Sequence, residues 1–211
     1  MSLPVSNEYL ALAFVNGRKV SNGDLGEFTL FQHPIGDLIL PTGQLVACDP
    51  FVAPVSVPFN LPAPTGRFPV VLTIADFGHD QRVAFATIRF ENELPVTWKM
   101  MATGSNDPAT LEPGQHFGYA VDSGTGCFMD HSAAQALFAK MKAEPEYYKF
   151  MIAEMQKTYR HTWDWLNLPM GEANVIAFHS GLGDGIYATY AALNADEQVV
   201  AVVTEFGVAP E

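Results

Sequence analysis

Two acidic loops flanked by glycines hold the residues of this chain best suited to chemistry. The first loop spans 121–130 and the second spans 179–185. Each follows an apolar run typical of a strand, and glycine lets the backbone turn sharply or come close to a ligand. We therefore expect a ligand-binding site at these loops. Its candidate residues there are Asp122, Gly124, Asp130, Gly183, Asp184 and Gly185.

Carboxylate oxygens are the ligands that hard divalent cations prefer. With Asp49 as a further candidate, the aspartates of the two loops would supply an oxygen-rich site, and Asp122 and Asp184 are its leading metal ligands. The spacing matches no calcium loop, and the chain holds neither an H-E-x-x-H nor a C-x-x-C motif. The loops therefore predict either a divalent-metal site or a site for a small polar molecule.

Each aspartate also has a structural interpretation. Asp184 followed by Gly185 is a typical hairpin turn, because both turn positions need a positive φ. Asp130 lies just before Ser132, where a negative charge favours the start of a helix. Asp122 enters a glycine-rich turn, where a carboxylate often accepts hydrogen bonds from nearby backbone N–H groups. These interpretations stay open beside ligand binding.

Cys127 indicates a different chemistry. It follows the glycine-rich stretch 124–126 and lies shortly before a predicted helix start, a position that can lower the pKa of a thiol. A histidine would act as the base and an aspartate would orient it. Of His116, His131 and His179, we take His179 as the partner of Cys127 in a hydrolase or transferase. The alternative is a buried cysteine that acts as a small hydrophobic side chain.

Charge and composition limit the classes of function. The formal net charge is −12, which repels phosphate backbones and argues against nucleic-acid binding. The same charge suits a cationic ligand, a metal ion or a basic protein partner.

No run approaches the roughly 18 apolar residues of a membrane span. Glu8 precedes the short apolar run 10–15, where a signal peptide would carry positive charge, so we expect a cytosolic protein.

Apolar runs bounded by glycine and proline predict a chain rich in strands. We expect a hairpin at 41–43, a second one at the Gly-Asp-Gly turn between 175–178 and 186–193, and a third at 194–197. Apolar residues on both faces of 82–90 indicate a central strand. The predicted strands are 37–40, 44–48, 70–75, 82–90, 96–102, 117–121, 175–178, 186–193 and 199–206.

Six prolines between 50 and 69 exclude a helix or a central strand there. We expect a loop over 50–69 that wraps the body of the protein and is anchored by Phe51, Val57 and Phe59. This prediction treats the proline-rich stretch as part of one globular domain, 1–211, rather than as a linker between two domains.

A two-helix block is predicted over 132–167. Ser132 and Gln135 fit a capping box at the start of the first helix, and Pro145 suits the first turn of the second. Apolar residues then recur at helical spacing, which is typical of a core-facing stripe. The predicted stripe of the second helix holds Tyr148, Ile152, Met155, Tyr159, Trp163 and Leu166. The fold class is therefore α+β, with a mainly antiparallel sheet or sandwich and a two-helix block inserted before the last strands.

Several motifs, taken together in their order along the sequence, resemble the domain of unknown function 4241. These motifs span 36–43, 48–50, 64–70, 119–126, 129–130 and 180–185. That family is largely bacterial and is marked by a Gly-Asp-Gly tripeptide. The resemblance covers nearly the whole chain and implies a single-domain protein with no established activity. It draws attention to Asp49, Asp122, Asp130 and Asp184 without giving them roles.

Three classes of function follow, and no motif fixes a reaction. The first is a small-ligand or divalent-metal-binding protein, with or without hydrolytic activity, in which the aspartate loops converge. The second is a non-enzymatic acidic interaction or immunity-type module that binds a basic protein. The third is a hydrolase or transferase that depends on Cys127 and requires a reactive thiol with a histidine within hydrogen-bond reach.

Overall fold

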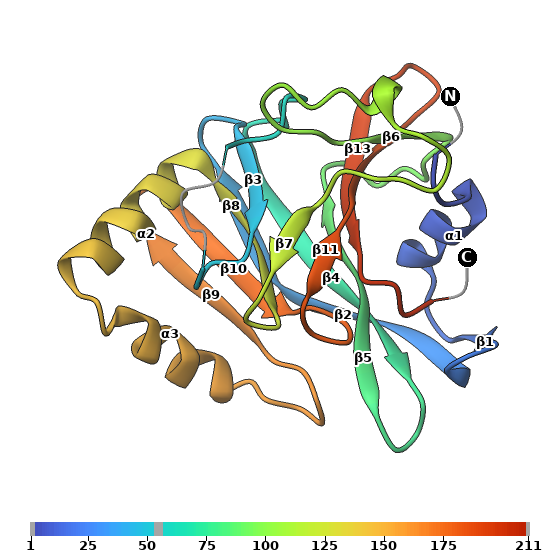
Figure 1. The fold of residues 1–211 in the computed structure, drawn as a ribbon, viewed down its shortest axis with the longest axis horizontal. Helices are drawn as coiled ribbons and strands as arrows, with labels where there is room; N and C mark the ends of the chain where they lie inside the picture. The colour runs from blue at the N-terminus through green and yellow to red at the C-terminus, as the bar shows by residue number, and fades with distance from the viewer. Residues whose placement is uncertain (1–2, 53–56, 210–211) are drawn as a thin grey trace.

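Two packed antiparallel sheets form the body of the protein (Figure 1). The computed structural model describes residues 3–52 and 57–209. Over those ranges, the larger sheet holds seven strands and the smaller sheet holds four. In spatial order the larger sheet consists of β1 (Arg18–Asn22), β2 (Gly26–Leu40), β4 (Gly66–Asp76), β5 (Gln81–Arg89), β13 (Val199–Glu205), β12 (Thr189–Leu193) and β6 (Thr97–Met100). The smaller sheet consists of β3 (Leu45–Cys48), β8 (Thr125–Asp130), β10 (Ala173–His179) and β9 (Trp165–Met170).

Short elements complete the fold. A two-stranded ribbon is formed by β7 (Tyr119–Val121) and β11 (Gly185–Tyr187). The helices are α1 (Asn7–Ala11), α2 (His131–Ala143) and α3 (Tyr147–Gln156), with 3₁₀ turns at Leu12–Phe14 and Pro108–Thr110. In Figure 1, α2 and α3 cover the face of the smaller sheet that is turned away from the larger sheet. The predicted α+β class with mainly antiparallel strands is confirmed.

The alternation of side chains along β8 and β10 divides the core into two layers. Phe128, Ile176 and Phe178 point toward the larger sheet and join its main hydrophobic cluster. Cys127 and Ala177 point the other way and pack in a second cluster with residues of α2 and α3. Because successive side chains of a strand point to opposite faces, a strand that lies between two layers is apolar on both faces. The smaller sheet is therefore the middle layer of the molecule.

Two predicted hairpins are wrong. Residues 41–43 connect β2 of the larger sheet to β3 of the smaller sheet, and these two strands do not pair. The Gly-Asp-Gly turn leads from β10 to β11, which pairs with β7 instead. At both places the glycine residues do mark a change in the direction of the chain. The chain then enters a different sheet instead of pairing back as a hairpin. The hairpin at 194–197 is confirmed, since β12 pairs with β13. The strand over 82–90 is also central, as predicted.

The predicted two-helix block ends earlier than 167. The second helix stops at Gln156, and β9 begins at Trp165. The Thr158 hydroxyl lies within hydrogen-bond distance of both Met155 O and Trp165 O, which share its one proton, and it accepts from Trp165 N, so it links the helix end to the strand start. Trp163 is buried between the sheets rather than on a helix.

The predicted stripe of the second helix matches its buried face only in part. Met155 is buried as predicted, but Tyr148, Ile152 and Tyr159 are exposed, and Met151 completes the buried face instead. Spacing alone could not place the stripe, because the apolar residues beyond Gln156 belong to a different element.

The predicted loop over 50–69 is a loop only in its first part, because β4 begins at Gly66. Phe51 packs against the second cluster and Phe59 against the main cluster, whereas Val57 is exposed and anchors nothing. Residues 53–56 of this loop lie outside the described residues.

Candidate functional site

The two glycine-flanked loops lie side by side, but the first is shorter than the predicted 121–130, because residues 125–130 form the buried strand β8 and only 122–124 are a loop. Gly124 N donates a hydrogen bond of 3.0 Å to Asp184 Oδ1, and Ser180 N donates one of 3.0 Å to Gly124 O. The pairing of β7 with β11 places Val121 opposite Gly185. Asp122 and Asp184 are both exposed. The structure therefore brings the Asp184 carboxylate onto the backbone of the first loop, while leaving both carboxylates open to solvent.

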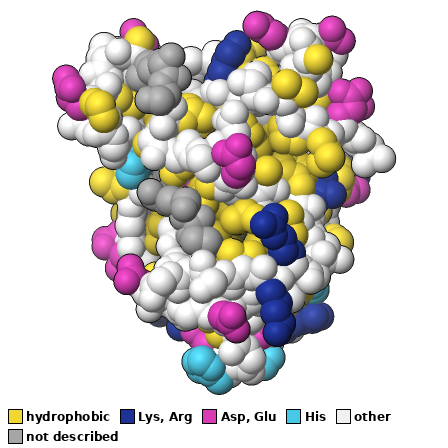
Figure 2. Space-filling model, turned by 90° about the vertical axis from the view of Figure 1, so that its right-hand side faces the viewer, with side chains coloured by type: hydrophobic (Ala, Val, Ile, Leu, Met, Phe, Trp, Pro, Cys, Tyr) yellow, Lys and Arg dark blue, Asp and Glu magenta, His cyan; other side chains and the backbone are white. Residues whose placement is uncertain are grey.

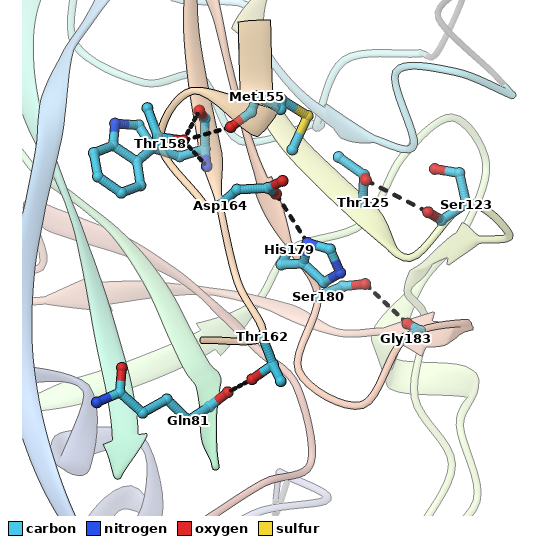
Figure 3. A network of polar contacts seen from close by, with 11 residues as sticks. Gln81, Ser123, Thr125, Met155, Thr158, Thr162, Asp164, His179, Ser180 and Gly183 are labelled. Carbon is cyan, nitrogen blue, oxygen red and sulfur yellow. Dashed lines mark hydrogen bonds and ion pairs between the residues drawn. The ribbon is translucent and has the colours of Figure 1, made fainter. Parts of the chain in front are cut away.

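The second loop is held by its own polar groups. Gly183 O accepts from Ser180 Oγ at 2.8 Å (Figure 3). It also accepts from Tyr187 Oη at 2.7 Å. Gly183 N donates to Ser180 O at 2.7 Å. Ser180 is fully buried, so its hydroxyl is a structural donor here. The loop therefore presents Asp184 from a fixed backbone.

The buried side chain of Asp49 holds the first loop in place. Its buried carboxylate accepts from Asp122 N at 3.0 Å, Ser123 N at 2.8 Å and Ser123 Oγ at 2.8 Å. It also accepts from Phe51 N at 2.9 Å. A buried carboxylate with this many protein donors has little capacity left for a ligand. Asp49 was expected to bind a ligand, but its contacts are those of an internal support for the loop.

Asp130 is the N-cap of α2. Its buried carboxylate accepts from the backbone N–H and hydroxyl groups of both Thr42 and Ser132. Burial alone would raise the pKa of Asp130, but the hydrogen bonds from Ser132 and Thr42 outweigh it and hold the pKa below its ordinary value. The capping interpretation therefore describes Asp130 better than the ligand-binding one. The cap is Asp130 and not the predicted Ser132, which lies inside the helix.

Cys127 lies in β8 directly opposite Cys48 in β3, and the two sulfur atoms are 3.6 Å apart. Both thiols are free and buried. Burial, together with the neighbouring Cys48, raises the pKa of the Cys127 thiol well above its ordinary value. A thiol with a raised pKa stays protonated near neutral pH and is a poor nucleophile. The structure therefore supports the small hydrophobic interpretation of Cys127.

The predicted histidine bases have other partners. A ring nitrogen of His116 contacts Ile186 O at 3.2 Å, and one of His131 contacts Gln135 Nε2 at 3.1 Å. His179 contacts Asp164. None of these contacts includes Cys127, so the proposed cysteine–histidine pair is not formed in the structure.

An aspartate that sequence reasoning missed supports His179. The distance from His179 Nδ1 to Asp164 Oδ1 is 2.9 Å, and His179 N also donates to Asp164 O at 3.2 Å. The side chain of Asp164 is only 10% exposed, whereas that of His179 is 34% exposed. Figure 3 shows the imidazole with one nitrogen toward Asp164 and its other edge turned away. Asp164 lies within the predicted two-helix block 132–167, so its position beside His179 was not foreseen.

This dyad fixes the roles of the two ring nitrogens. A carboxylate only accepts, so Nδ1 carries the proton that it donates to Asp164, and in the neutral imidazole Nε2 then carries a lone pair. His179 ends β10 opposite Thr125, the first residue of β8, so it lies where the first loop enters the sheet. The arrangement can accept a proton at Nε2 and stabilise the resulting charge through Asp164.

The parts of the chain that the structure describes contain no cluster of three or more His, Cys, Asp or Glu side chains arranged to hold a metal ion. In those same residues, no helix has the length and hydrophobicity needed to cross a membrane.

The fold and the site define an α+β protein of two packed antiparallel sheets, with two joined glycine loops and a buried-aspartate–histidine dyad at one end of the smaller sheet. Residues 38–204 match the family model described as "Protein of unknown function (DUF4241)", and the chain belongs to this family. The matched region contains both loops, Asp164 and His179. Among curated proteins and solved structures, the comparisons found no match.

Proposed function

We propose that this protein binds a small polar molecule at the two joined loops and hydrolyses it, with His179 as the general base. The observation that carries the proposal is the 2.9 Å contact between the buried Asp164 carboxylate and His179 Nδ1, which leaves Nε2 available. Aspartate in this position holds the imidazole in one tautomer and stabilises the imidazolium that forms.

Water is the nucleophile in this proposal. The Ser180 hydroxyl already donates to Gly183 O and the Ser123 hydroxyl to Asp49, so neither is poised for attack. His179 Nε2 takes a proton from a water molecule while the water oxygen attacks an ester or amide carbon of the substrate. The leaving alcohol or amine then takes the proton from the imidazolium, so the histidine returns to its starting state.

The exposed carboxylates of Asp122 and Asp184 favour a substrate with an amine or several hydroxyl groups. The carboxylate of Asp184 accepts from Gly124 N through Oδ1, which leaves its second oxygen for a ligand. An amine paired with a carboxylate forms a charge-assisted hydrogen bond, which is stronger than a neutral one. The substrate class is therefore a small cationic or polyhydroxylated ester or amide.

The first test measures turnover of p-nitrophenyl esters and aminoacyl p-nitroanilides by the wild type and by variants. His179→Gln and Asp164→Asn are each expected to lower the turnover rate at least about a hundredfold, because each removes part of the general base. His116→Gln is the matched control and is expected to keep wild-type turnover. Equal turnover by wild type and His179→Gln would overturn the proposal.

The second test measures binding without turnover. A thermal-shift screen of amines, amino-acid esters, sugars and divalent metals is run on wild type, Asp122→Asn and Asp184→Asn. A compound that raises the melting temperature of wild type and not of the two variants locates the ligand at the loops. Stabilisation that both variants retain would place the ligand elsewhere.

A further inference from the structure

The edge strand β6 has an open side. It ends the larger sheet and pairs with β12 alone. Met101 N donates to Thr189 O at 2.8 Å, so Met101 and Lys99, two residues before it, direct their backbone groups toward β12. In an antiparallel ladder the neighbouring residues then direct theirs to the opposite side. These are Trp98 and Met100, and among residues 3–52 and 57–209 no backbone partner occupies that side of them.

A cavity lies beside this open edge. Its volume is about 640 Å³, within the range of protein ligand sites. Most of its lining is apolar, and Trp98 forms part of it while remaining only 6% exposed. We name this cavity and the adjoining strand the β6 groove. Its apolar lining residues are Leu3, Pro4, Trp98, Met100, Leu111 and Pro113.

A hydrophobic area lies on the same side of the molecule as the N-terminal segment. Figure 2 shows the side of the molecule that carries α1 and the N-terminal segment, with hydrophobic side chains spread over much of its middle and few charged groups among them. Leu3 and Pro4 of that segment line the cavity. An apolar area with polar surroundings is typical of an interaction site.

The charges at the groove favour a basic partner. The one lysine of the lining, Lys99, is already paired with Glu197 at 3.6 Å. Glu112 also lines the cavity, and within the described parts of the chain its carboxylate forms no ion pair. The net charge of −12 adds a long-range attraction for cations and disfavours a second copy of the same chain.

We infer that the β6 groove binds an extended segment of a basic protein, which adds a strand to the larger sheet. The backbone of the segment pairs with the free N–H and C=O groups of Trp98 and Met100. Its alternate side chains point to one face, so apolar ones enter the cavity, and a long lysine or arginine side chain of the opposite face extends around the new sheet edge to the exposed Glu112 carboxylate. This interaction is separate from the hydrolysis proposed above and uses none of the residues of the two loops.

The test uses a short fluorescent peptide in which lysine and leucine alternate, and measures binding by fluorescence anisotropy. The same peptide with methylated backbone nitrogens keeps the side chains but cannot donate to the strand edge. A peptide in which glutamate replaces lysine tests the charge. Both control peptides are expected to bind at least about tenfold more weakly than the lysine–leucine peptide.

Two protein variants locate the binding. Leu111→Asn is expected to weaken binding of the lysine–leucine peptide about tenfold, because it places an amide in the apolar cavity. Glu112→Gln is expected to weaken it about threefold, as for an exposed ion pair. The matched control is Ile152→Asn, an exposed apolar residue of α3, which should bind as wild type. Circular dichroism checks that each variant is folded.

Three results would overturn the inference: no binding of the lysine–leucine peptide, equal binding of the methylated peptide, or full binding by Leu111→Asn. Sedimentation gives a fourth. A wild-type dimer that Leu111→Asn dissociates would show that the groove holds a second copy of the chain instead.

Discussion

At the scale of single residues, the carboxylate of Asp130 links the end of β8 to the start of α2 and to the connection between the two sheets. It caps α2 and accepts hydrogen bonds from Thr42 in the connection between the two sheets. Asp130→Ala is expected to lower the free energy of unfolding by about 2 to 4 kcal/mol, because the cap and the bonds to Thr42 are lost together. Urea unfolding at neutral pH measures the change, with Asp122→Ala as an exposed control that is expected to cost less than about 0.5 kcal/mol.

The same residue predicts a dependence of stability on pH. The folded-state pKa of Asp130 lies below its ordinary value of 3.8, so its ionised form stabilises the fold at all pH values above that. This contribution falls as the pH drops below about 4 and is lost below the folded-state pKa. The stability difference between wild type and Asp130→Asn should therefore shrink at low pH. A difference that stays constant down to acid unfolding would contradict this account.

The roles of the aspartates were only partly predictable from the sequence. Turn and cap signals gave the correct alternative for Asp130, because its main donor Ser132 is two residues away. Asp49 takes its donors from Asp122 and Ser123, and Asp164 meets His179 only because β9 and β10 pair. Contacts between distant segments decide whether a carboxylate points inward, and no local pattern encodes them.

At the scale of elements, the bend of the second loop depends on Gly181. Its φ is +48°, and a Cβ there would lie 2.7 Å from the Phe206 side chain and 2.9 Å from Phe206 O. Gly181→Ala is expected to cost about 2 to 4 kcal/mol, from the left-handed backbone and from the overlap. Urea unfolding of Gly171→Ala provides the control. Gly171 has a φ of +66° and open space around it. Gly171→Ala is therefore expected to cost only the roughly 1 kcal/mol of placing a residue with a Cβ in the left-handed backbone conformation. Equal costs for the two variants would show that the close approach to Phe206 does not matter.

Elements were easier to predict than their partners. Most strands were found because apolar runs end at glycine or proline, as at β4, β5 and β13. β9 was missed because Trp163 and Leu166 continue the helical spacing of the preceding helix, and β8 was missed because its residues were assigned to the first glycine-flanked loop. The hairpins predicted at 41–43 and at the Gly-Asp-Gly turn were wrong. The sequence of a tight turn is the same whether the next strand pairs with the preceding one or enters another sheet.

At the scale of the whole molecule, β13 closes the larger sheet by pairing with both β5 and β12. A fragment of residues 1–198 is therefore expected to lack a cooperative thermal transition, because β5 and β12 would each lose a partner and the buried face of β13 would be missing. Circular dichroism during heating measures this, and addition of a peptide of residues 199–209 is expected to restore the transition. A cooperative transition of the fragment alone would show that β13 is dispensable.

The position of β13 has a consequence during protein synthesis. β10 lies in the middle of the smaller sheet and β13 inside the larger one, and both follow β5 and β8 in the sequence. While the ribosome is still making these residues, β5 and β8 have emerged with one edge unpaired and their apolar faces uncovered. Such edges favour pairing with other chains. Until β10 and β13 have been made, the nascent chain therefore exposes the kind of apolar, unpaired surface that chaperones of emerging polypeptides bind.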